Sequence, residues 1–261
     1  MPTGFDLAIK DIRCFGETSG IIEVNSVIGG TPPYEFTLTD ANGEPVQGFN
    51  SLAAGDYTVS LLDANGCEID TTVSISSPDQ LLVSLGDDIT IQLGEEVTVA
   101  AEIVNDDNVP VESWSWNPLA HCDTTCLDYT WMPTATYRQR ITVIDENGCE
   151  ASDEVLVIVR KDRLVYVPTI FDPESNDPAN SLLSIYTGTG VTKVRKWLIF
   201  DRWGDAVFQV DDYLAVPSNV PDPAFAWDGK VRGEKVTPGV YVWYAEIEFA
   251  DGVVEIFKGD V

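Results

Sequence analysis

A chain of 261 residues, 44% of them hydrophobic, is long enough for two or three domains with packed cores. Its 43 acidic residues against 15 basic ones give a formal net charge of −28, and this charge would repel a nucleic-acid backbone or an anionic membrane surface. The apolar run Val155–Val159 has the length of a strand, and no segment approaches the roughly 18 apolar residues of a membrane helix. We therefore expect no nucleic-acid partner and no membrane span.

Residues 1–78 show the period-two alternation of half-buried strands, interrupted by residues typical of tight turns. Gly55-Asp-Tyr57 is placed like the corner of an immunoglobulin-type sandwich, in which a tyrosine hydroxyl bonds back to the backbone. This pattern predicts an antiparallel β-sandwich. Its clearest strands and turns are Ile21–Val24, Tyr34–Leu38, Asp40-Ala-Asn-Gly43 and Asp63-Ala-Asn-Gly66.

Residues 79–161 repeat this organisation after a break at Ser77-Pro-Asp79. The turn Glu146-Asn-Gly-Cys149 matches Ala64-Asn-Gly-Cys67 in the first segment, and a turn that recurs at domain spacing indicates tandem sandwiches. The predicted strands are Leu81–Leu85, Ile89–Leu93, Val97–Val104, Ser113–Trp116, Ile141–Ile144 and Val155–Val159.

Residues 162–261 follow the short polar break Lys161-Asp-Arg163. An apolar strand runs into a Trp-Gly turn, a Trp-Asp-Gly turn follows, and a strand alternating around Tyr241 and Trp243 precedes a closing strand. No segment has the pattern of a long amphipathic helix. The sequence therefore predicts an all-β protein of three tandem antiparallel, immunoglobulin-like β-sandwiches, at 1–78, 79–161 and 162–261.

The chain has five cysteines. A disulfide between Cys14 and Cys67 would tie the opening strand of the first sandwich to a late one, with a stabilisation of about 4 kcal/mol in the chain-entropy model. Cys122 and Cys126 are close enough to close a small loop, which leaves Cys149 over. These spacings favour an oxidising, non-cytoplasmic setting, while the pairing itself is not fixed by sequence.

His121 is the only histidine, which excludes sites built from several histidines of one chain and leaves little basis for nucleophilic catalysis. A zinc site of His121, Cys122, Cys126 and Cys149 is one alternative, although Cys-x3-Cys in an exported sandwich is more often a disulfide. No Gly-x-Ser-x-Gly elbow and no phosphate-binding glycine loop is present. We expect a non-catalytic chain, and an enzyme would need its catalytic domain upstream of residue 1.

An acidic, proline-rich loop carries Asp172, Glu174 and Asp177, whose spacing can place several oxygens around Ca²⁺. The alternative is a solvated loop held open by its prolines. Ca²⁺ is the one cofactor that the sequence brings into consideration.

The seven tryptophans admit a glycan-binding interpretation, because exposed indole faces stack on sugar rings. Strand settings instead place Trp116, Trp197 and Trp243 in interiors. Arg202 and Asp228, each beside a tryptophan, are a candidate ion pair between two turns.

The first segment resembles the SprB repeat of large surface adhesins from gliding bacteria, and the second more loosely resembles PKD-like and Ig-like modules. The first resemblance rests on the ordered features Cys14, Gly29-Gly30, Pro33-Tyr34, Gly55-x-Tyr57 and Asn65-Gly-Cys67. The second rests on Trp114-Ser-Trp-Asn-Pro118, the Cys122/Cys126 pair and the turn Asp145-Glu-Asn-Gly-Cys149.

The third segment resembles the C-terminal domain of gliding-motility-associated proteins, the type B sorting signal of the type IX secretion system. Two departures are the loop Asp172–Asp177, where the family has Asn-Gly-Asp-Gly, and the end at Val261, beyond which members usually continue. The matching motifs are Val167-Pro-Thr169, Phe200-Asp-Arg-Trp-Gly204, Trp227-Asp-Gly229, Pro238-Gly-Val-Tyr241 and Lys258-Gly-Asp-Val261.

This resemblance implies export across the outer membrane by the type IX translocon, with a PorP/SprF-type outer-membrane β-barrel protein as partner. The chain would then be the stalk and sorting region of a secreted or cell-surface adhesin that passes through the periplasm. Met1–Phe5 shows no export signal, so an exported protein of this sequence would be a piece of a longer one.

The candidate anchors for the partner are Arg202, Trp203, Trp227 and Tyr241, because Arg and aromatic side chains dominate protein interfaces. Each of them serves equally well as a turn or core residue. An extracellular glycan- or Ca²⁺-binding module remains the rival interpretation.

Overall fold

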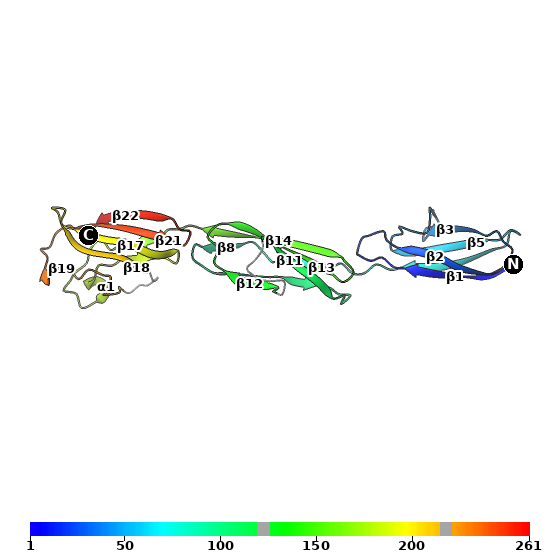
Figure 1. The fold of residues 1–261 in the computed structure, drawn as a ribbon, viewed down its shortest axis with the longest axis horizontal. Helices are drawn as coiled ribbons and strands as arrows, with labels where there is room; N and C mark the ends of the chain where they lie inside the picture. Colours follow the sequence, from blue (N-terminus) through cyan, green and yellow to red (C-terminus); the bar gives the residue numbers. More distant parts are fainter. Residues whose placement is uncertain (119–125, 215–220) are drawn as a thin grey trace. The chain divides into compact units, whose positions relative to one another are not determined.

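The computed structural model describes residues 1–118, 126–214 and 221–261, and these residues form a nearly all-β chain with tandem β-sandwiches (Figure 1). The fold class predicted from sequence is thereby confirmed. The described residues contain no helix with the length and hydropathy needed to cross a bilayer.

Two compact units can be described separately, and β13 and β14 contribute to both. The N-terminal unit comprises Met1–Leu85, Ala101–Leu127 and Arg140–Glu154, and the C-terminal unit comprises Gly86–Ala100, Asp128–Gln139 and Val155–Val261. The three predicted domain ranges therefore stay predictions.

In the N-terminal unit the two-stranded sheet β1-β2 and the four-stranded sheet β4-β3-β5-β6 enclose one core (Figure 1). Ile22 of β2, Leu38 of β3 and Val59 of β5 are buried there. Phe5 of β1 packs edge-on against Phe36 of β3, with the two ring centres 5.9 Å apart. Period-two alternation puts such residues on one face of each strand. The strands are β1 (Pro2–Lys10), β2 (Ile21–Gly29), β3 (Glu35–Asp40), β4 (Pro45–Val46), β5 (Gly55–Leu62), β6 (Glu68–Ile75), β7 (Leu82–Ser84), β10 (Glu102–Val104), β11 (Val111–Asn117), and parts of β13 (Tyr137–Asp145) and β14 (Glu150–Arg160).

One turn design recurs after Asp40, Asp63, Asp145 and Asp201. In each turn the aspartate N–H donates to the carbonyl four residues later at 3.0 to 3.1 Å, and its Oδ1 accepts the N–H of that same residue. The glycine three residues after the aspartate has a φ between 79° and 90°, which other residues rarely adopt. Asp-x-x-Gly is thus a structural signature that the strands on both sides require.

The C-terminal unit is built on the antiparallel sheet β18-β17-β21-β22 (Figure 1). Trp197 and Val194 of β17 and Ile247 of β21 are fully buried on one face, together with Trp227 from a connecting turn. Its elements are β8 (Ile89–Gln92), β9 (Val97–Ala100), β12 (Asp128–Trp131), β15 (Val165–Tyr166), α1 (Pro178–Ser181), β16 (Tyr186–Thr187), β17 (Val191–Phe200), β18 (Ala206–Leu214), β19 (Lys230–Val231), β20 (Glu234–Lys235), β21 (Val242–Phe249) and β22 (Val254–Asp260).

Two predicted features of the middle segment are wrong in detail. The sheets are not wholly antiparallel, because β14 pairs with β8 in parallel register from Val157 opposite Ile89. The predicted strand Val97–Val104 breaks at Ala101, so that β9 pairs with β12 and β10 with β7. Both differences are choices of pairing partner, which the alternation of one segment does not specify.

The polar break Lys161-Asp-Arg163 is an anchor within the C-terminal unit. Arg163 contacts Asp251 at 2.9 Å and Glu255 at 2.9 Å, and its guanidinium lies 4.5 Å from the centre of the Phe249 ring. Lys161 adds a second contact to Asp251 at 3.0 Å. The segment is therefore fixed to the turn between β21 and β22.

Replacing Asp251 by Asn is expected to destabilise the C-terminal unit by about 2 kcal/mol at neutral pH, because the half-buried Arg163 loses a charged partner. Burial raises the pKa of the Asp251 carboxyl, but hydrogen bonds from Lys161 and Arg163 outweigh it and hold the pKa below the ordinary 3.8. The contribution is thus present above the unfolded pKa and is lost as pH falls through the folded pKa.

Urea unfolding of wild type and Asp251→Asn, at neutral pH and in acid, measures this difference. Glu23→Gln, which removes an exposed pair with Lys10, is the control and should change little. A gap between wild type and Asp251→Asn that persists unchanged in acid would rule out the electrostatic explanation.

Candidate partner-binding surface

Trp227 of the Trp-Asp-Gly motif is a core residue. It is 1% exposed, lies against Phe171 and Tyr241 with ring centres 5.4 and 5.2 Å away, and donates from Nε1 to the Lys230 carbonyl at 3.1 Å. Its backbone forms a bridge with Leu183. The predicted direct contact of Trp227 with a partner is therefore wrong, because no indole surface is available.

The rest of that motif makes the turn. Asp228 accepts the backbone N–H of Lys230 at 3.1 Å and its Nζ at 2.9 Å, and the side-chain bond to Lys230 is the main cause that lowers the pKa of Asp228. A Cβ on Gly229 would lie 2.5 Å from Pro173 Cγ. The predicted Arg202–Asp228 pair is wrong, since Lys230 is the nearer cation.

Tyr241 forms a tyrosine corner. Its hydroxyl donates to the Thr237 carbonyl, four residues back, at 2.7 Å. The corner predicted at Tyr57 is confirmed by the matching bond to the Ala53 carbonyl at 3.0 Å. Gly-x-Tyr stands at the entrance to a strand in both places, and this signal would have identified the second corner.

The closing motif Lys258-Gly-Asp-Val261 also has a structural role. A Cβ on Gly259 would come within 2.7 Å of the Trp243 indole, so glycine leaves the space in which that ring lies. Val261 exchanges two backbone hydrogen bonds of 2.9 Å with Tyr241. Trp116 and Trp197 are buried as predicted, and Trp243 packs partly exposed against the core.

Arg202 and Trp203 are different, because the turn does not need them. Asp201 and Gly204 build the turn, and the positions between them hold Ala-Asn or Glu-Asn in the three other copies. Trp203 is 83% exposed and is the exposed member of the seven tryptophans, all of which lie in the described ranges. Nothing in the packing of the sheet accounts for an indole at this position.

Three of the four predicted anchors meet on one surface. A pocket of about 120 Å³ is bordered by Arg202, Trp203, Val240 and Tyr241, and Val240 is itself 65% exposed. Tyr241 also borders a second pocket of about 360 Å³, whose lining includes Trp227. We call Arg202, Trp203, Val240 and Tyr241 the anchor surface; the buried Trp227 packs against its Tyr241.

The structure does not bring the predicted Ca²⁺ ligands together. Asp172 accepts the Glu174 N–H at 2.9 Å, Glu174 pairs with Lys235, and Asp177 caps α1 through the Ala179 N–H at 3.0 Å. In the part of the chain that the structure describes, no group of three or more metal-ligating side chains converges. Asp172 and Asp177 instead accept hydrogen bonds within their own loop, and Glu174 forms an exposed ion pair with Lys235.

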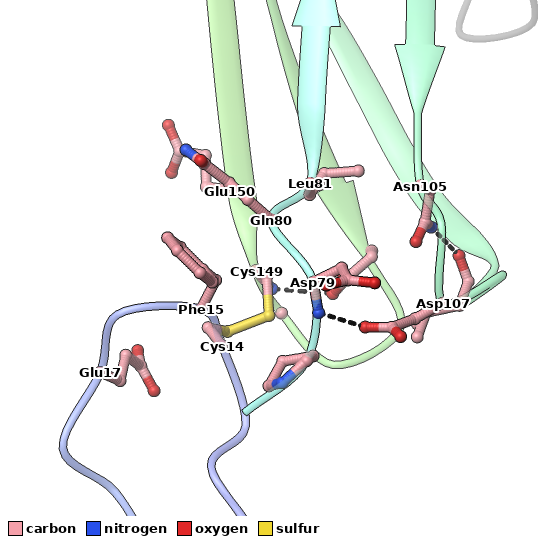
Figure 2. A pocket seen from close by; sticks show the side chains of 14 residues that line it. Cys14, Phe15, Glu17, Asp79, Gln80, Leu81, Asn105, Asp107, Cys149 and Glu150 are labelled. Atoms are coloured by element: carbon pink, nitrogen blue, oxygen red, sulfur yellow. Dashed lines mark hydrogen bonds between the residues drawn. A yellow bond between two sulfur atoms is a disulfide. The ribbon is translucent and has the colours of Figure 1, made fainter. Parts of the chain in front are cut away.

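The disulfide pairing differs from the prediction. Cys14 bonds to Cys149, with their Cα atoms 5.4 Å apart (Figure 2). Cys67 is a free thiol. Ile12 bonds to the Ser76 carbonyl, so Cys14 lies near the last residues of β6, whereas Cys67 precedes its first. The eight residues of β6 separate these ends by roughly 25 Å, too far for a Cys14–Cys67 bond.

These bonds also exclude the zinc alternative. Cys126 and Cys149 are both disulfide-bonded and so cannot supply thiolates to zinc. The other half of the predicted Cys122–Cys126 pair, Cys122, lies outside the described residues, as does His121. The Cys126 carbonyl accepts the indole N–H groups of Trp114 and Trp116 at 3.2 and 3.1 Å.

The SprB repeat family model matches residues 7–43, from β1 into the turn after β3. Similar solved structures include a tetra-tandem repeat from the extending region of a large adhesion protein, at 15% identity, covering 99% of this chain and 74% of that chain with a TM-score of 0.36. Three N-terminal domains of the bacteriophage RB49 Hoc capsid protein are 14% identical, and the match covers 99% of this chain and 95% of that chain with a TM-score of 0.38. A 1.5-MDa bacterial ice-binding adhesin is 13% identical, and the match covers 100% of this chain and 97% of that chain with a TM-score of 0.31. No curated protein matches the chain.

Proposed function

We propose that this chain belongs to an exported cell-surface protein, in which the N-terminal unit forms part of an adhesin-like stalk and the C-terminal unit is a sorting domain. The SprB repeat match over residues 7–43 supports a surface protein, and disulfide bonds support an oxidising compartment. The chain acts by binding and carries no catalytic step of its own.

The observation that carries the sorting proposal is Trp203 at the tip of its turn. The turn after Asp63 shows that the same geometry forms with Ala-Asn between the aspartate and glycine. Burying 150 Å² or more of apolar surface stabilises a protein by roughly 4 kcal/mol. The Trp203 indole, with 83% of its surface exposed, does not contribute this hydrophobic free energy to the fold. A partner that covers the ring recovers this free energy.

The proposed partner is a PorP/SprF-type outer-membrane β-barrel protein of the type IX translocon. Trp and Arg are the side chains that most often dominate protein interfaces, and Arg202 stands beside Trp203 on an otherwise strongly acidic chain. The strong net charge would meanwhile suppress contacts with other acidic surfaces. Recognition then rests on a few side chains of the anchor surface.

An export assay tests the proposal. The full chain would be placed behind a signal peptide and a fluorescent reporter, and expressed in a gliding bacterium with and without a working type IX translocon or its PorP/SprF-type protein. We expect surface or medium delivery in the wild type and periplasmic retention in both mutants. Delivery that continues in both mutants would refute the sorting function.

A further inference from the structure

We infer that the Cys14–Cys149 disulfide is a covalent bypass that removes the segment between the two cysteines from the path of a pulling force and limits how far the chain can extend. The biological use of such a bypass rests on the proposed stalk function. The inference itself rests on chain connectivity and on the surroundings of the bond.

Connectivity determines what is protected. The two cysteines are 135 residues apart, and every strand from β2 to β13 lies between them. Tension that enters before Cys14 and leaves after Cys149 passes through the S–S bond. Strands β3, β5 and β6, which hold most of the N-terminal core, therefore carry none of it.

The surroundings keep the bond closed. Both cysteines are 9% exposed, and the Cys149 N–H donates to Asp145 Oδ1 at 2.8 Å. The bond lies at a pocket of about 330 Å³. Figure 2 shows Asp79 and Gln80 passing beside it. A reductant attacks as a thiolate anion, and the pocket presents carboxylates rather than basic groups to it. The acidic residues that line it are Glu17, Asp79, Asp107, Asp145 and Glu150.

Opening the bypass is a balanced redox step. A dithiol reductant supplies two electrons and two protons, becomes a cyclic disulfide, and leaves thiols on Cys14 and Cys149. The released segment then adds 135 residues of extensible chain, or roughly 450 to 490 Å when fully drawn out. The bypass is thus a redox-dependent limit on extension.

Single-molecule force spectroscopy on the full chain tests this inference. Handles would be joined to both ends by peptide ligation, so that no cysteine is used. We expect the oxidised protein to reach a contour length roughly 450 to 490 Å shorter than Cys14→Ser/Cys149→Ser, and a dithiol to abolish the difference. Cys67→Ser should behave as the oxidised wild type.

Equal contour lengths for the oxidised protein and the double serine variant would overturn the inference. A deficit of less than half the expected value would also overturn it, because that is the signature of a Cys14–Cys67 bond. The export assay is independent of this measurement. Export that does not depend on the type IX translocon would remove the sorting proposal and leave the bypass. An oxidised protein that extends as far as the double serine variant would remove the bypass and leave the sorting proposal.

Discussion

Replacing Cys14 and Cys149 together by serine is expected to lower the free energy of unfolding of the enclosed segment by about 5 kcal/mol. A disulfide stabilises chiefly by restricting the unfolded chain, and the restriction grows with the logarithm of the enclosed length, here 135 residues. Urea unfolding followed by circular dichroism, with and without reductant, gives the difference.

Cys67→Ser is the matched control for this loss. Cys67 occupies the same position in its turn as Cys149 does, but its thiol is free, so its replacement should change stability by no more than about 0.5 kcal/mol. If Cys67→Ser lowered stability as much as the double variant, or if reductant had no effect on the wild type, the Cys14–Cys149 pairing would be incorrect.

Trp227→Ala is expected to destabilise the C-terminal unit by about 3 to 5 kcal/mol, because it leaves a large cavity beside Phe171 and Tyr241. The indole hydrogen bond to the Lys230 carbonyl is lost as well. Thermal unfolding should show an earlier transition for this unit.

Trp203→Ala is the comparison, since it removes the same side chain from the surface. Its stability should stay within about 0.5 kcal/mol of wild type, while tryptophan fluorescence should lose its most solvent-quenched component. Similar stability losses for the two variants would show that Trp203 is packed in solution and would remove the basis of the anchor surface.

Local patterns predicted much of this fold. The four Asp-x-x-Gly turns and the Tyr57 corner follow from bonds made within a few residues of one another, and such bonds are encoded by short segments. Most strands were predicted from the period-two alternation of their side chains. In the third segment, Trp227, Tyr241 and Gly259 likewise stand where the core or a turn requires them, whereas Arg202 and Trp203 do not. Arg202, Trp203 and Tyr241 border one pocket, and their role in binding a partner stays a prediction.

The errors concern long-range choices. Cys67 was the predicted partner of Cys14, and only the folded chain shows that Cys14 lies near the end of β6, far from Cys67, and bonds to Cys149. The parallel pairing of β8 with β14 has the same origin. The core position of Trp227, one of the two alternatives left open for it, also depends on a distant residue, because its backbone bridges to Leu183.

The most direct test of the anchor surface is a turn exchange. Arg202→Ala with Trp203→Asn gives the turn after Asp201 the residues of the turn after Asp63, so the backbone bonds should persist. In the export assay we expect this variant to remain in the periplasm with an unchanged melting temperature, while Ile256→Thr, which alters another exposed apolar residue, is exported. Export of the turn variant at the wild-type level would contradict the account.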